Sequence, residues 1–174
     1  MFHPMSDWFW FSENSQLTLS MGKDWQCTTA YGQKQITNLP KAQQLFNLSD
    51  TECYLFLADH LNASARHFSD AQLTHILINA TAATMFHKPV TPKSWFLDEI
   101  ESFGFHNRLA RVVNKFSSGV VLVLGDESHL ATCMLISSKL LLTENKILRQ
   151  FDLIKVAKNR LEPLLLETRS QLTA

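Results

Sequence analysis

Two prolines near the middle of the chain, Pro89 and Pro92, interrupt its pattern. Each proline fixes its own φ and pushes the residue before it toward extended geometry. Residues 88–95, KPVTPKSW, are therefore expected to form a stiff, non-helical strap. Lys88 and Lys93 on such a strap lose little ordering entropy when they meet a partner, and a buried Trp95 would anchor it. The alternative is a connection between domains with solvated lysines.

The charge of the chain changes at the strap. Residues 1–87 carry 4 Lys and Arg against 7 Asp and Glu, a net −3, and residues 88–174 carry 12 against 9, a net +3. The total of zero argues against a protein held to nucleic acid or anionic lipid mainly by its overall field. We place a domain boundary in the dozen residues after Lys88, giving domains of residues 1–96 and 97–174.

Aromatic residues alternate near the amino terminus, in residues 8–11 with the sequence WFWF. In a strand, Trp8 and Trp10 point to one face and the two phenylalanines to the other, so the strand is covered on both sides or lines a pocket. Tryptophan is enriched at binding hot spots, which makes Trp8, Trp10 and Leu17 candidates for a partner pocket. More often, such residues belong to the core.

The remaining pattern predicts an α+β protein. Residues 17–21 and 25–31 complete a three-stranded antiparallel meander, and residues 53–57 read as a further strand. A long helix is predicted over residues 69–87, because Ser69 and Gln72 form a capping box before a 3.6-residue apolar period. In the second half we expect strands at residues 108–116, 119–124, 130–137 and 140–143, then a short helix at residues 152–160.

Signatures of catalysis are lacking from the sequence: there is no G-x-G-x-x-G, Walker A, G-x-S-x-G or H-E-x-x-H motif. Cys27, Cys53 and Cys133 are far apart, so we read them as small buried hydrophobes rather than as zinc ligands or a disulfide framework. We expect no metal and no cofactor. No apolar run approaches the roughly 20 residues that span a bilayer. The amino terminus lacks the basic region of a signal peptide, so a cytoplasmic location is expected.

Several short motifs, in a fixed order, resemble the ZapC family of cell-division proteins. These are D-W-x-W-F at residues 7–11, K-P-x-x-P-K-S-W at residues 88–95, A-x-C-x-L at residues 131–135, and D-x-x-K followed by N-R-L-x-P in residues 152–163. Single pieces such as W-x-W are weak signals. Their order and spacing together are more specific.

The resemblance implies a non-enzymatic protein that binds the tubulin-like polymer FtsZ directly, bundles its protofilaments laterally and stabilises the division ring at mid-cell. It implies an α/β domain with a hydrophobic pocket, followed by a small twisted β-barrel. The expected contact residues are Lys88, Pro89, Pro92, Lys93 and Trp95, and the expected pocket residues are Trp8, Trp10, Leu17 and Leu19. We expect no nucleic acid partner, no membrane insertion, and a monomer or weak self-association.

Two other functions remain open from the residues alone. The basic second half would suit a small β-barrel that binds nucleic acid, with aromatic residues for stacking. However, Trp8 and Trp10 lie in the acidic half. An enzyme or ligand carrier that uses the amino-terminal pocket is the third possibility.

Overall fold

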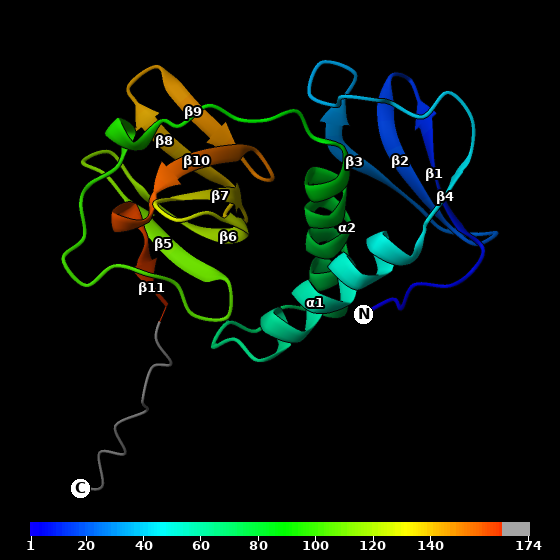
Figure 1. The fold of residues 1–174 in the computed structure, drawn as a ribbon, viewed down its shortest axis with the longest axis horizontal. Coiled ribbons are helices and arrows are strands. Elements are labelled where there is room, and N and C mark those ends of the chain that lie inside the picture. Colours follow the sequence, from blue (N-terminus) through cyan, green and yellow to red (C-terminus); the bar gives the residue numbers. More distant parts are fainter. Residues whose placement is uncertain (165–174) are drawn as a thin grey trace, which may run out of the picture.

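A computed structural model describes residues 1–164 of the chain. Two antiparallel sheets flank a pair of helices, with α2 between them and α1 packed beside α2 (Figure 1). The elements of the first half are β1 (Trp8–Glu13), β2 (Gln16–Met21), β3 (Gln26–Gly32), β4 (Gln44–Leu45), α1 (Leu48–Asn62) and α2 (Asp70–Phe86). Those of the second half are η1 (Ser94–Phe96), β5 (Leu109–Val113), β6 (Ser118–Asp126), β7 (Leu130–Leu135), β8 (Lys139–Thr143), β9 (Lys146–Arg149), β10 (Leu153–Ala157), η2 (Lys158–Arg160) and β11 (Glu162–Pro163).

The first sheet contains the predicted meander, in the order β3-β2-β1-β4. Asn14 and Ser15 join β1 to β2 with φ angles of 50° and 63°, the geometry of a tight type I′ hairpin whose twist matches the strands. Trp10 pairs with Leu19 across this hairpin. Both side chains lie on the face that is buried against the helices.

Two helices, rather than one, belong to the first half. The predicted helix is confirmed as α2, and its capping box of Ser69 and Gln72 is formed. The strand expected at residues 53–57 is wrong, because these residues lie inside α1. A capping box of Asn47 and Asp50 starts this helix, and it satisfies backbone N–H groups that a helix start otherwise leaves unpaired.

The second half forms an open five-stranded antiparallel sheet, β10-β7-β6-β5-β11, and a separate β8-β9 hairpin. The expectation of a barrel is therefore wrong: within residues 1–164 no sheet closes on itself. The helix expected at residues 152–160 is also wrong. Its first part is strand β10, in which Ile154 and Val156 are buried and alternate with less buried neighbours, and only the short 3₁₀ turn η2 follows.

The main hydrophobic core joins the two halves of the chain. Side chains of the second half, including Leu122, Met134 and Phe151, pack in one cluster with Tyr31 and Leu77 of the first half. A second cluster lies wholly within the second half. No helix within residues 1–164 is both long enough and apolar enough to cross a membrane.

Candidate partner-binding surface

The strap, residues 88–95, runs from the end of α2 across to the second sheet (Figure 1). Its first residue is tied to the first half, since the Lys88 N–H donates to the Gln35 carbonyl at 2.8 Å. Near its other end, the Lys93 N–H donates to the Lys155 carbonyl of β10 at 2.8 Å, and Pro92 forms a parallel bridge with Lys155. The strap is thus fixed at both ends, as expected of a rigid segment.

Both lysines of the strap keep their charge available. Lys88 is exposed, and its Nζ donates to the Lys34 carbonyl oxygen at 2.9 Å. Lys93 is half-buried. Neither lysine has a carboxylate partner within residues 1–164. In the described part of the chain, the two positive charges are therefore not neutralised by carboxylates.

Two further lysines, Lys34 and Lys41, lie at the Lys88 end of the strap. Lys41 and Lys88 line one surface hollow of about 580 Å³, and among the residues that the structure describes no Asp or Glu lines it. Lys34 is held beside Lys88, because the Lys88 Nζ donates a hydrogen bond to the Lys34 backbone carbonyl. Sequence reasoning missed both residues, because both are far from the strap along the chain; Lys34 and Lys88, for example, lie 54 residues apart.

Trp95 does not anchor the strap, contrary to expectation. Its side chain is 71% exposed. The anchoring groups are its neighbours: Leu97 is buried in the second core, and the Ser94 hydroxyl accepts a hydrogen bond from the Ala157 N–H at 2.7 Å. With these contacts in place, the backbone holds Trp95 outward.

Phe96 and Lys146 lie beside the exposed indole. The rings of Trp95 and Phe96 are 5.6 Å apart, and Lys146 Nζ lies 4.7 Å from the centre of the Phe96 ring, within cation–π range. The exposed indole, with Lys93 two residues before it and Lys146 over the neighbouring Phe96 ring, combines an aromatic residue of the kind enriched at binding hot spots with positive charge that complements an acidic partner.

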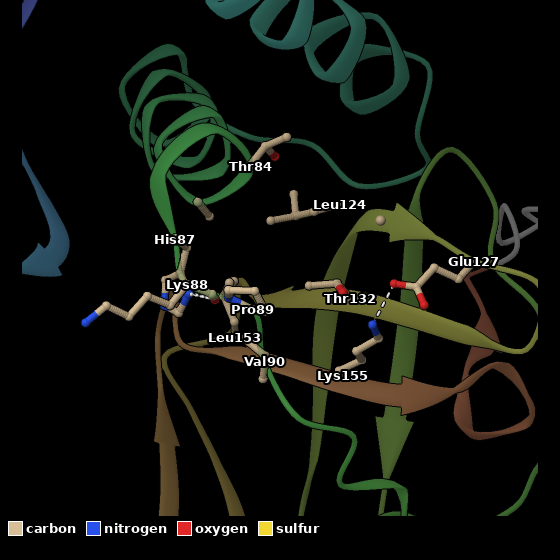
Figure 2. A pocket seen from close by; sticks show the side chains of 12 residues that line it. Thr84, His87, Lys88, Pro89, Val90, Leu124, Glu127, Thr132, Leu153 and Lys155 are labelled. Atoms are coloured by element: carbon tan, nitrogen blue, oxygen red, sulfur yellow. Dashed lines mark hydrogen bonds and ion pairs between the residues drawn. The ribbon is translucent and has the colours of Figure 1, made fainter. Parts of the chain in front are cut away.

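A second hollow, of about 250 Å³, lies beside the start of the strap, between the end of α2 and the second sheet. Thr84, Pro89 and Leu124 are among its lining residues, and the Lys155–Glu127 ion pair closes one side at 2.6 Å (Figure 2). The Lys88 side chain points away from this hollow (Figure 2). Lys88 thus presents its charge to the outer surface.

Comparison with known proteins bears on this surface. The family model described as "Cell-division protein ZapC, N-terminal" matches residues 1–88, and "Cell-division protein ZapC, C-terminal" matches residues 89–167. The chain belongs to the ZapC family of cell-division proteins. Curated relatives named "Cell division protein ZapC" include one from Pseudoalteromonas atlantica, 37% identical over 171 residues and 96% of both chains. Another, from Shewanella oneidensis, is 33% identical over 165 residues, covering 92% of this chain and 93% of its own.

These matches show that the chain is a cell-division protein, and the two ZapC models meet within the strap, between Lys88 and Pro89. The ZapC motif K-P-x-x-P-K-S-W thus lies at the junction of the two matched regions. Any surface that includes the strap therefore contains residues of both matched regions.

The four residues expected to line the ZapC pocket lie in the core. Trp8, Trp10, Leu17 and Leu19 are each at most 1% exposed. Trp10 Nε1 donates to the buried Asp50 carboxylate at 3.3 Å, and the Trp8 ring meets Tyr54 edge-on. None of the four lines the hollows described above. Of the two alternatives for Trp8, Trp10 and Leu17, the structure thus shows the core, while Phe9 and Phe11 on the other face of β1 are half-buried.

The cysteines are poorly suited to thiolate chemistry. Burial raises the pKa of Cys133 to about 12 and that of Cys27 to about 11, so both stay protonated at neutral pH. Cys133 is fully buried, whereas Cys27 and Cys53 are half-buried. Within residues 1–164 no group of three or more His, Cys, Asp or Glu side chains is placed to hold a metal.

Proposed function

We propose that this protein binds FtsZ directly through the strap, as a non-enzymatic factor that bundles protofilaments laterally and stabilises the division ring at mid-cell. The observation that carries the proposal is the pair of strap lysines, Lys88 and Lys93, which have no acidic partner within residues 1–164 and lie on the same segment as the exposed Trp95. Membership of the ZapC family supplies the role in cell division.

Electrostatics favours this surface as the contact. FtsZ is an acidic protein, so neighbouring protofilaments repel one another and a bridge must offset that repulsion. The whole chain has a formal charge of zero, so it adds no net negative charge between the protofilaments. Lys34, Lys41, Lys88 and Lys93 concentrate positive charge along the strap, which speeds encounter with an acidic surface and makes binding sensitive to salt.

Trp95 supplies the apolar part of the proposed contact. A tryptophan that is already held outward loses little conformational freedom on binding, and it can bury a large apolar area. Pro89 and Pro92 keep the segment between the lysines extended, so the spacing of the charges is set before the partner arrives. A polymer repeats the contact, and avidity compensates for weak individual sites.

Co-sedimentation with purified FtsZ assembled in GTP tests the function as a whole. The wild-type protein should pellet with filaments at high speed, and it should move FtsZ into the low-speed pellet that contains bundles. Absence of the protein from the high-speed pellet, at low salt and with filaments in excess, would reject direct binding. Pelleting without bundles would reject lateral joining.

Nucleic acid binding by the second half is less well supported. Four of its basic side chains are already neutralised by internal ion pairs: Arg111–Glu162, Lys155–Glu127, Lys158–Asp126 and Arg160–Glu99. Less of its positive charge is therefore free for phosphates than the sequence suggests. A mobility-shift titration with single-stranded DNA checks this, and tight, salt-sensitive binding would favour the nucleic acid function.

A further inference from the structure

A basic hollow at the amino-terminal end of α2 lies at the opposite end of this helix from the strap. It has a volume of about 280 Å³ and is lined from the first half by Arg66, His67, Gln72 and His75, among others. The second half contributes residues that include Gln150 and Phe151. The hollow thus lies on the seam between the two halves.

We propose that this hollow is a second contact for acidic side chains of the filament, so that one molecule of this protein holds two protofilaments. The inference rests on the proposed function. It assigns the strap and this hollow, which we call the Arg66 hollow, to different filaments. A monomer can then bundle without first forming a dimer.

The charge that Arg66 brings to the Arg66 hollow is positive. No Asp or Glu is among its lining residues, and Arg66 has no ion-pair partner within residues 1–164. The nearest acid along the helix, Asp70, is held instead by the ammonium group of Met1 at 3.0 Å. The guanidinium therefore remains available to an external carboxylate, which it can bind with two parallel hydrogen bonds.

Neighbouring groups hold the walls of the hollow in place. The Arg66 guanidinium lies 5.6 Å from the centre of the Phe68 ring, and the His75 ring meets Phe151 edge-on at 4.8 Å. Gln150 donates to the Ile136 carbonyl at 3.0 Å. Gln72 closes the capping box with Ser69, so the first turn of α2 is already satisfied and fixed. An incoming carboxylate meets the Arg66 guanidinium in a hollow whose walls are already fixed, which lowers the cost of binding.

The distance between the two basic surfaces suits a bridge. Helix α2 has 17 residues, and at 1.5 Å per residue its ends are about 25 Å apart. The strap begins just after its last residue (Figure 1), and Gln72 and His75 of its first turns line the Arg66 hollow. Because the main core joins both halves around this helix, the two surfaces are held at a fixed separation.

Arg66→Glu separates bundling from binding. Lys23 is exposed, lies in the turn between β2 and β3, and has no ion-pair partner within residues 1–164, so Lys23→Glu is a control with the same change of charge. Both variants and the wild type are added to FtsZ filaments in GTP. Binding is measured in the high-speed pellet, bundling in the low-speed pellet and by light scattering, and folding by urea unfolding.

We expect Arg66→Glu to bind filaments within about twofold of wild type but to lose most of the bundling, at least fivefold, while Lys23→Glu retains both. Wild-type bundling by Arg66→Glu would overturn the inference. Loss of both binding and bundling in a folded Arg66→Glu would also overturn it, since the two contacts would then not be separable. Failure of the wild type to bind at all would instead reject the proposed function.

Discussion

The hydroxyl of Tyr31 donates a hydrogen bond of 2.7 Å to the backbone carbonyl of Phe151, a residue 120 positions further along the chain. Tyr31 lies on β3 and is almost fully buried, so burial strongly raises the pKa of its phenol. Phe151 has a φ of 71°, a geometry that most side chains avoid, in the turn between β9 and β10. This bond joins the two halves, and it fixes the turn that helps line the Arg66 hollow.

Tyr31→Phe tests the link between the halves. The substitution leaves the Phe151 carbonyl without its donor in a buried setting, so the free energy of unfolding should fall by about 1–2 kcal/mol. Tyr54→Phe is the control: its hydroxyl donates to the Phe2 carbonyl near the amino terminus, at a partly buried site, and its removal should cost less. Urea unfolding gives both values. An equal loss in the two variants would contradict the role assigned to Tyr31.

The carboxyl of Asp50 makes the stability of the protein depend on pH, and the direction of that dependence follows from its pKa shift. Burial raises the pKa of its carboxyl above the ordinary value of 3.8, against the opposing effect of hydrogen bonds from the Asn47 N–H and the Trp10 indole. The folded state therefore holds this proton more tightly than the unfolded state. The contribution of Asp50 to stability is greatest below its unfolded pKa, and it falls as pH rises through the folded value.

Asp50→Asn should remove that dependence. Both hydrogen bonds go to one oxygen, Oδ2, and an amide oxygen at that place can still accept them. Stability at pH 7.5 should be unchanged or higher, with a flatter profile as pH rises above the ordinary carboxyl pKa of 3.8. Asp50→Ala should cost about 1–3 kcal/mol, because the Trp10 indole N–H is left without an acceptor. Urea unfolding measures the stability of both variants. A similar loss of stability in Asp50→Asn and Asp50→Ala would show that the charge itself is stabilising.

Trp95 and Trp10 should respond differently to truncation. Trp95→Ala removes an exposed ring, so the change in stability should stay within about 0.5 kcal/mol, while filament binding should weaken about tenfold or more. Trp10→Ala opens the core and should cost about 3–5 kcal/mol. Thermal unfolding and co-sedimentation measure the two effects. Full binding by folded Trp95→Ala would remove this residue from the contact.

Local signals in the sequence were sufficient for α2. Ser69, Gln72 and Pro89 mark its ends, and the apolar residues between them repeat every 3.6 positions. For α1, four consecutive apolar or aromatic residues, YLFL at residues 54–57, suit a strand as well as a helix. The capping box that decides the question uses Asn47 and Asp50 in place of the usual Ser or Thr with Glu or Gln.

The composition of the candidate surface depended on contacts that no local pattern reveals. The motif identified Lys88 and Lys93, but the hydrogen bond to the Lys34 carbonyl depends on how the loop after β3 folds back. Likewise, Trp95 is exposed because Ser94 is held by the Ala157 N–H, 63 positions away. A sequence window around Trp95 alone cannot distinguish a buried indole from an exposed one.

The most direct test of the account is the filament affinity of the double variant Lys88→Glu plus Lys93→Glu. Its control is Lys23→Glu plus Lys139→Glu, which changes the charge by the same amount at exposed sites away from the strap. Affinity comes from high-speed pelleting at several FtsZ concentrations, with urea unfolding to show that each protein is folded. We predict that the strap variant loses most of its pelleting, since only the Arg66 hollow remains to contact the filament, while the control keeps it. Equal pelleting of wild type, control and folded strap variant would contradict the claim that the strap contacts the filament.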